Sequence, residues 1–308
     1  MYVSNLETPP CNICGSTAFR VLLPARPDQA PPSHGDLVRT FSSSGNERLS
    51  HQLVACTGCG LQYVSPRLRA EAVLDGYAHG SDETFVSQMR GREITFDKSL
   101  DVIMRAWHGP SGRLLDIGTG SGAFPYVASK RGWQADGCEP NRWLCEWARA
   151  NYGLNIGAGT LFEQRYPAAS YDLVTLWDVL EHTPDSKREI EEARRLLRDG
   201  GLLVVTYPDI GSWIARLMGR RWVFLLDVHL YYFTRTTIRR LLEDIGFELV
   251  RLAPHVQRLG LGYILHRASP YAGPPARAAS RLAVRLGLAD RQVPYWMGQT
   301  LVIARKVR

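Results

Sequence analysis

Apolar and polar positions follow two alternating periods through most of this chain. Short apolar runs typical of buried strands are separated by stretches whose apolar residues recur at helical spacing. The expected strands are 113–118, 133–140, 154–159, 171–179, 202–208, 247–253 and 299–307. This alternation predicts an α/β fold with an open, mostly parallel, seven-stranded sheet and helices on both faces.

Stop and cap signals bound the helices between these strands. Ser186 and Glu189 have the spacing of a capping box, and Asn141 and Thr234 are further candidate N-caps. The expected helices are 66–77, 83–107, 123–131, 141–153, 186–200 and 234–246.

The chain divides by composition into three parts. Residues 1–65 hold two cysteine pairs around a loop rich in Pro, Ser and Gly, and 66–110 read as a helical connector. Residues 111–308 form the main domain, whose rhythm is interrupted by insertions at 209–233 and 254–297.

A glycine-rich turn follows the first strand of the main domain. In "RLLDIGTGSGAF", Asp116 precedes Gly118, Gly120 and Gly122. No Lys follows the last glycine, which excludes a P-loop, and an acid before the turn would repel a pyrophosphate but attract an ammonium group. Glu139, 17 residues after Gly122, can accept both hydroxyls of a ribose. These features favour a nucleoside that carries a cationic amino acid and no phosphate, as in S-adenosylmethionine.

The motifs around this turn resemble those of a known family. The segments "LLDIGTGSG", "CEPN", "YDLVTLWDVLEH", "LLRDGGLLVVTYP" and "HLYYFT" resemble class I S-adenosylmethionine-dependent methyltransferases. The similar subgroup contains O-methyltransferases of quinone biosynthesis and often carries an N-terminal cysteine-rich zinc-binding segment. The resemblance is strongest over residues 113–250. It implies a Rossmann-like sheet and an enzyme that transfers methyl groups to a small-molecule acceptor, anionic or apolar, most often at a hydroxyl.

The resemblance also implies roles for individual residues. It assigns cofactor binding to the turn and to the ends of the second and fourth strands: Asp116, Gly118, Thr119, Gly120, Gly122, Glu139 and Asp178. The acid that the family often places near the adenine is replaced here by "AGTLFE", so backbone and apolar packing are expected to hold the adenine.

Two histidines are candidate general bases for methyl transfer to a hydroxyl. His182 follows the fourth strand, and His229 precedes the helix that begins near Thr234. Imidazole is the usual base near neutral pH, so the pH–rate profile is expected to show a limb near ~6.5. His182 can instead brace the turn before its helix, whereas His229 is the stronger candidate for the base.

The insertion 209–233 mixes aromatic residues with arginines. It reads as a lid over an apolar substrate, because insertions after the fifth strand lie at the ligand edge of such sheets. A crossover helix packed in the core and a membrane-surface helix are the alternatives.

Four cysteines form two C-x-x-C turns, each followed by Gly. Cys11, Cys14, Cys56 and Cys59 are expected to bind one structural Zn²⁺ through four thiolates. The 41-residue loop between the pairs is longer than is usual for a zinc ribbon. Redox pairs and reduced core thiols are the alternatives.

The charge is uneven along the chain. Residues 209–308 hold 16 Lys and Arg against 6 acids, whereas 1–208 hold 21 against 24. A basic field favours anionic partners, so an RNA or protein methyltransferase is the second hypothesis, and a non-catalytic binding module is the third. The sequence shows neither a secretion signal nor a membrane span, which indicates a cytoplasmic protein with at most peripheral membrane contact. It does not indicate an oligomeric state.

Overall fold

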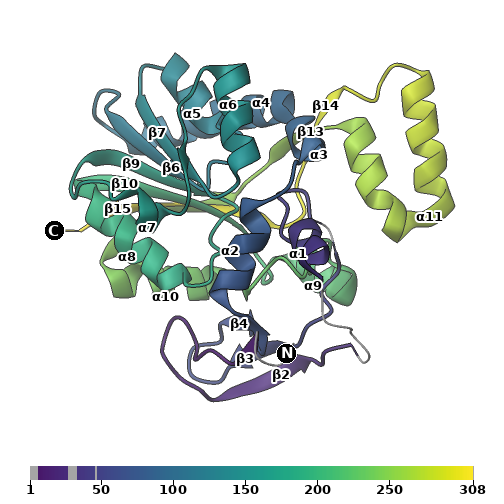
Figure 1. Ribbon diagram of the computed structural model, residues 1–308, viewed down its shortest axis with the longest axis horizontal. Coiled ribbons are helices and arrows are strands. Elements are labelled where there is room, and N and C mark those ends of the chain that lie inside the picture. Colours follow the sequence, from purple (N-terminus) through teal and green to yellow (C-terminus); the bar gives the residue numbers. More distant parts are fainter. Residues whose placement is uncertain (1–5, 27–32, 46, 308) are drawn as a thin grey trace.

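A seven-stranded sheet forms the centre of the molecule (Figure 1). The computed structural model describes residues 6–26, 33–45 and 47–307, except for the side chains of 269–272. The strand order is β12-β15-β10-β9-β6-β7-β8, and β15 runs antiparallel to both of its neighbours while the others pair in parallel. The strands are β6 (Arg113–Ile117), β7 (Gln134–Glu139), β8 (Gly157–Ala158), β9 (Tyr171–Trp177), β10 (Leu197–Pro208), β12 (Phe247–Pro254) and β15 (Gln299–Lys306). The predicted α/β class and mostly parallel sheet are confirmed.

The side chains of successive strand residues pack into two apolar layers, one on each face of the sheet. Leu114 packs with helices α4 (Met89–Ala106) and α5 (Ala123–Lys130), whereas Leu115 packs with α8 (Ser186–Leu196) and α10 (Arg235–Ile245). This alternation follows from the two-residue period of a strand. Two further helices, α6 (Arg142–Tyr152) and α7 (Leu161–Gln164), flank β7 and β8.

Several element boundaries differ from the prediction. The expected helix 83–107 is divided into α3 (Glu83–Val86) and α4, and the expected strand 154–159 is reduced to the two residues of β8. The expected capping box at Ser186 is wrong. Asp185 is the N-cap of α8, and its side chain accepts from the Arg188 N–H. Ser186 is the first helical residue, and its Oγ donates to the carbonyl oxygen of Leu180 and does not cap the helix.

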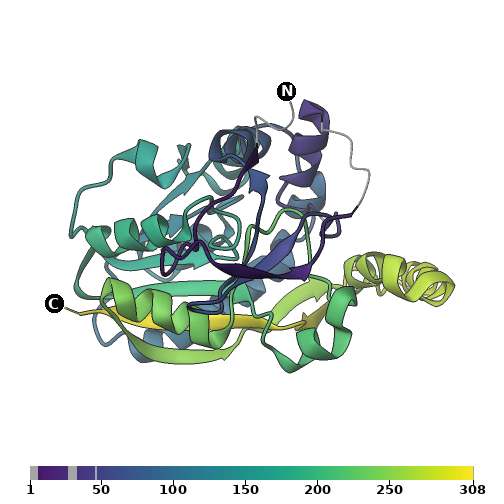
Figure 2. The ribbon, with the colours of Figure 1, turned by 90° about the horizontal axis from the view of Figure 1, so that it is seen from below.

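The N-terminal segment shares a sheet with the insertion after β10. β2 (Phe19–Leu23), β3 (Leu53–Cys56) and β4 (Gln62–Val64) pair in sequence, and β11 (Tyr231–Tyr232) completes the sheet beside β4. Figure 2 shows this sheet lying across the domain. The strands β1 (Leu6–Glu7) and β5 (Arg67–Leu68) form a short pair, and α1 (His34–Thr40) packs on α2 (Ala70–Ala78). The insertion 209–233 is therefore joined to the N-terminal segment through the pairing of β11 with β4.

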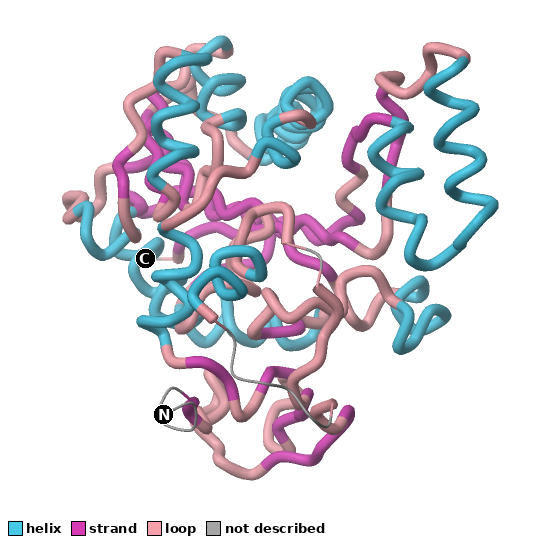
Figure 3. The backbone as a smooth tube through the Cα atoms, turned by 45° about the vertical axis from the view of Figure 1, so that its right-hand side comes forward, coloured by secondary structure: helices cyan, strands magenta, loops and turns pink. Residues whose placement is uncertain are grey.

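The second insertion forms a projecting arm. β13 (Gln257–Gly260) and β14 (Gln292–Tyr295) are an antiparallel pair that brackets α11 (Leu261–Arg285), which reverses at Gly273. Figure 3 shows the two parts of α11 side by side, away from the central sheet. In the first insertion, α9 (Trp213–Met218) is followed by a 3₁₀ turn, Gly219–Arg221. Among the described helices, none is long and apolar enough to cross a membrane.

Candidate active site

A cavity of about 280 Å³ lies at the carboxyl ends of β6, β7 and β9. Its lining includes Asp116, Glu139 and Asp178, one from the end of each of these strands. The rest of the lining comes from the loop after α1, from α2–α4, from the segment before β11, and from β13, α11 and β14. Ligands in open α/β sheets bind at this edge, so the cavity is the candidate active site.

The glycine turn brings bare backbone to the cavity wall. Gly118, Gly120 and Gly122 all have positive φ values, of 61°, 57° and 77°. A Cβ on Gly118 would lie 2.8 Å from Val179, and one on Gly120 would lie 3.0 Å from the Phe85 ring. Thr119 also lines the cavity, and Gly122 lies at the start of α5 as its N-cap. Side chains at Gly118 and Gly120 would be strained and crowded.

Glu139 is buried at the end of β7 with both carboxylate oxygens bonded to backbone. The Gly120 N–H donates to Oε2 at 2.8 Å, and the Asn141 N–H donates to Oε1 at 2.9 Å. Burial raises the pKa of Glu139 in spite of these two bonds. The carboxylate ties the glycine turn to the start of α6 and lines the cavity, and each of its oxygens can accept a further hydrogen bond.

Asp116 is buried beneath the turn. Thr175 Oγ1 donates to its Oδ1 at 2.6 Å, and burial raises the pKa of Asp116 to about 7. A cation bound beside this carboxyl group would favour its ionised form.

Asp178 follows β9 in a left-handed conformation, with φ at 52°. Its Oδ1 accepts from Thr206 Oγ1 at 2.9 Å and its Oδ2 accepts from Gln257 Nε2 at 3.0 Å. These bonds fix the carboxylate between the central sheet and β13. A non-glycine residue in this conformation is uncommon and often marks a functional position.

The two candidate histidines lie together, although 46 residues separate them in the chain. Their ring centroids are 4.7 Å apart, and both line the cavity. His229 Nδ1 is 2.9 Å from the Phe224 carbonyl oxygen, which can only accept, so the proton sits on Nδ1 and Nε2 keeps a lone pair. His182 Nδ1 lies 3.2 Å from the Val228 carbonyl oxygen and 2.8 Å from Tyr77 Oη.

Burial changes the titration of both histidines. It lowers the pKa of His182 to about 4, and burial together with neighbouring His182 lowers the pKa of His229 well below its usual value. The imidazole pKa of ~6.5 expected from the sequence is therefore too high for both histidines. Both imidazoles are neutral at pH 7, the form that a general base requires.

Sequence reasoning missed Glu181, which lies beside this pair. It is 1% exposed, its two carboxylate oxygens have no hydrogen-bond partner among the described residues, and Oε1 is 3.9 Å from His182 Nε2. Burial and the nearby Asp178 raise the pKa of Glu181 well above its usual value. The motif "LEH" contained this residue, but its burial is decided by packing.

Other lining residues come from elements without any motif. Arg92 of α4 stacks its guanidinium 3.9 Å from the centre of the Phe85 ring, and its buried Nε has no hydrogen-bond partner in the described part of the chain. Tyr77, Gln257, Tyr263 and Arg267 also line the cavity. Helical periodicity predicted the helices that carry Tyr77 and Arg92, but the insertion 254–297, which forms β13 and α11, was predicted without any element. No signal in the sequence linked these residues to the glycine turn.

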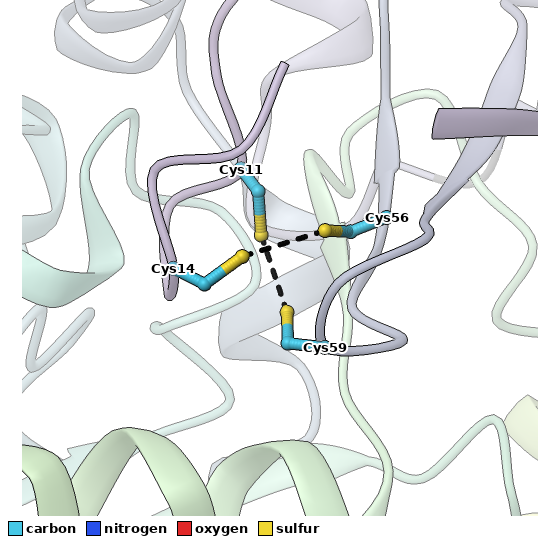
Figure 4. Close-up of side chains that lie close together, drawn as sticks. All are labelled: Cys11, Cys14, Cys56 and Cys59. Carbon is cyan, nitrogen blue, oxygen red and sulfur yellow. Dashed lines mark hydrogen bonds between the residues drawn. The ribbon is translucent and has the colours of Figure 1, made fainter. Parts of the chain in front are cut away.

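The four expected cysteines converge at one point away from the cavity (Figure 4). Cys11 Sγ lies 3.3 Å from Cys59 Sγ, and Cys14 Sγ lies 3.5 Å from Cys56 Sγ. The Gly58 N–H donates to Cys56 Sγ at 3.3 Å. At a zinc–sulfur distance of about 2.3 Å, the sulfurs of a tetrahedral site lie about 3.8 Å apart. The donor set and its spacing fit one such ion.

Comparison with known proteins identifies the family of this chain. The family model described as "Methyltransferase domain" matches residues 89–252, more than half of the chain. The chain belongs to this methyltransferase-domain family. The match covers the glycine turn, Glu139 and both candidate histidines.

Relatives of this methyltransferase-domain protein carry different names. It is 27% identical to a sarcosine/dimethylglycine N-methyltransferase of Halorhodospira halochloris over 50% of the chain and 58% of that protein. It is 30% identical to a ubiquinone biosynthesis O-methyltransferase of Vibrio cholerae over 29% of the chain and 39% of that protein. The chain thus spans little more than half of the first of these relatives. A solved structure of a SAM-dependent methyltransferase from Archaeoglobus fulgidus shares the fold, with a TM-score of 0.51, 17% identity, and 73% and 100% coverage of the two chains.

Proposed function

We propose that this protein transfers a methyl group from S-adenosylmethionine to a hydroxyl group of a small molecule. The observation that carries the proposal is a single cavity that combines the glycine turn and Glu139 with a neutral, buried pair of histidines. Bound S-adenosylmethionine supplies a methyl group on a positively charged sulfonium.

The donor set at the turn fits this cofactor. Glu139 would accept from the ribose hydroxyls, and Asp116 would face the ammonium group of the methionine moiety. Arg92 is suited to its carboxylate, because the Phe85 ring contacts both the Arg92 guanidinium and the Gly120 position. Asp178 would border the methyl group and the acceptor.

His229 is proposed as the general base. Its Nε2 accepts the proton of the acceptor hydroxyl, so that the oxygen can bond to the methyl group as the sulfur–methyl bond breaks. The Phe224 carbonyl oxygen holds Nδ1–H and so sets the tautomer that leaves Nε2 free. His182 positions the pair through Tyr77 and the Val228 carbonyl oxygen.

A small acceptor is favoured over RNA or protein by the enclosure of these groups. His229 is 4% exposed and Glu181 is 1% exposed, so an acceptor atom must enter the cavity to reach them. The names of the relatives include both N- and O-methyltransferases. The two neutral imidazoles support a hydroxyl as the acceptor group. A hydroxyl must lose its proton during methyl transfer, and a neutral imidazole can accept that proton.

We also propose that Cys11, Cys14, Cys56 and Cys59 bind one structural Zn²⁺. Four thiolates leave no open position on such an ion, and the ion would hold the sheet that contains β11.

The experiment that tests the central proposal is calorimetric titration with S-adenosylhomocysteine, followed by a screen of hydroxylated metabolites with methyl-labelled cofactor. Binding and transfer of label to a hydroxyl oxygen are expected. Absence of binding to the intact, zinc-loaded protein would refute the proposal, and transfer to an amine alone would replace the hydroxyl with nitrogen.

A further inference from the structure

The cavity contains a second guanidinium group besides that of Arg92. Arg267, from the first part of α11, lines the cavity, and its Nη1 donates to the Ser44 carbonyl oxygen at 3.2 Å. Among the described residues it forms no ion pair with a carboxylate. An arginine can donate five hydrogen bonds, so most of its donors have no partner among the described residues.

The Asp82 carboxylate bonds to the loop that Arg267 contacts, and both of its oxygens accept from backbone N–H groups. Asp82 accepts from the Ser44 N–H at 2.7 Å through Oδ2 and from the Phe85 N–H at 2.9 Å through Oδ1. These bonds connect the loop that Arg267 contacts to the helix that carries Phe85. Asp82 therefore organises the wall but forms no ion pair with Arg267.

Tyr263 lines the cavity together with both arginines. The Arg267 guanidinium is 6.0 Å from the Tyr263 ring centre. Arg92 and Arg267 thus bring two cations to a cavity whose lining also includes Asp116, Glu139 and Asp178.

The charges of the cofactor leave one of these cations unused. S-adenosylmethionine has a single carboxylate, which the proposed function assigns to Arg92 because Phe85 holds that guanidinium beside the glycine turn. No anion of the cofactor is left for Arg267. A guanidinium beside a phenol ring in a cavity is well suited to a carboxylate or a phosphate group, which it binds through paired hydrogen bonds.

We infer that Arg267, with Tyr263, recognises an acidic group on the methyl acceptor. The inference rests on the proposed function, since it takes the remainder of the cavity as the acceptor site. The acceptor is then a small hydroxylated molecule with a carboxylate or phosphate at the end away from the reacting hydroxyl. Arg267 determines specificity and takes no part in the proton transfer.

The test uses the Nε–Hε resonances of the arginine side chains in the zinc-loaded, full-length protein. Spectra are recorded with and without saturating S-adenosylhomocysteine, and the Arg267 signal is assigned from its absence in Arg267→Gln. Inorganic phosphate and acetate are titrated as separate arms, to distinguish the two acidic groups. Arg277→Gln is the matched control, because Arg277 is exposed on the same helix and does not line the cavity.

One or both anions are expected to shift the Arg267 resonance, and the shift should persist when S-adenosylhomocysteine occupies its own site. Arg267→Gln should lower the affinity for the more tightly bound anion by about tenfold or more, which is the value of a charge-assisted hydrogen bond. Arg277→Gln should leave that affinity unchanged. An Arg267 signal that neither anion moves, or equal anion affinity in Arg267→Gln, would overturn the inference. Failure of S-adenosylhomocysteine to bind would instead refute the proposed function, and the anion titration can be read without it.

Turnover supplies a second readout. Hydroxylated aromatic acids and their methyl esters are compared as acceptors, and acids are expected to be preferred. Arg267→Gln should raise KM for the acids by about tenfold or more and leave kcat and the ester KM nearly constant. Equal KM values for acid and ester in the wild type would show that Arg267 does not recognise the charge.

Discussion

Buried carboxyl groups dominate the cavity at the scale of single residues. Asp116, Glu139 and Glu181 are each less than a tenth exposed, and burial raises the pKa of all three. Such groups are costly without a partner in a medium of low dielectric. A ligand that brings an ammonium, a sulfonium and ribose hydroxyls would provide partners for them, which is the residue-level argument for S-adenosylmethionine.

Glu139→Gln should weaken the binding of S-adenosylhomocysteine by about 1–3 kcal/mol, because the ribose hydroxyls lose a charged acceptor. Calorimetric titration measures the change. Glu146→Gln, on the exposed face of α6, is the control and should bind as the wild type does. If Glu139→Gln binds as tightly as Glu146→Gln, the assignment of Glu139 to the ribose hydroxyls is wrong.

Asp116 should make cofactor binding depend on pH. Its pKa is raised to about 7 in the unliganded protein, so the carboxyl group is mostly neutral below pH 7 and charged above it. The ammonium group pairs with the charged form, so S-adenosylhomocysteine should bind about tenfold more weakly at pH 6 than at pH 8. Asp116→Asn should bind weakly and with little pH dependence. A flat wild-type profile would contradict this pairing.

His229→Ala should lower turnover by about 10²–10⁴, the usual contribution of a general base, with little effect on cofactor affinity. The pKa of His229 is depressed, so the base stays neutral as the pH falls and the acid limb of the wild-type rate should lie below ~6.5. Turnover at saturating cofactor checks both points.

His182→Ala is the comparison for the same reaction. If His182 only positions the pair, the variant should lose thermal stability more than turnover. A full loss of turnover at an unchanged melting temperature would transfer the role of base to His182.

At the scale of elements, the N-terminal sheet and the cavity wall are mechanically linked. β11 pairs with β4, and Leu226, just upstream, bridges to Arg48. The segment between them carries Val228 and His229, which line the cavity. The proposed zinc site would thus stabilise the wall that presents the proposed base.

Cys11→Ser should release the zinc and increase hydrogen exchange in both β4 and 226–232, because the two strands are paired. Elemental analysis should give one zinc per chain for the wild type and for Arg20→Gln, an exposed control on β2. A fully protected β11 in zinc-free protein would show that the sheet does not depend on the metal.

At the scale of the whole molecule, the cavity is assembled from segments that are distant in the chain. Residues from α2, α4, the 224–229 segment and β13 face the ends of β6, β7 and β9. A bound ligand would contact several of them together and would therefore stabilise the folded state as a unit.

S-adenosylhomocysteine at 100 times its Kd should stabilise the protein by about 2.7 kcal/mol and raise the melting temperature accordingly. Hydrogen exchange should slow at 116–122 and also at 83–92, because Phe85 and Arg92 contact the same ligand. Protection confined to 116–160 would mean that the N-terminal helices do not belong to the cofactor site.

The sequence by itself determined the features that depend on neighbouring residues. The strand RLLDI, the glycine turn and the caps at Asn141 and Thr234 follow from local periodicity, positive φ and short-range hydrogen bonds. The α/β class follows from their order along the chain. The position of Glu139 near the turn also follows, because parallel strands present their carboxyl ends at one edge.

Only the tertiary structure decided which distant side chains share a cavity. It brings His182 to His229, places Arg92 and Arg267 in the lining of one cavity, and pairs β11 with the cysteine-bearing sheet. Burial set by that packing moves the histidine pKa values away from neutral pH. The physical reason is that helical and strand periods report which face of an element is buried, whereas the neighbour across that face depends on contacts spread over the whole chain.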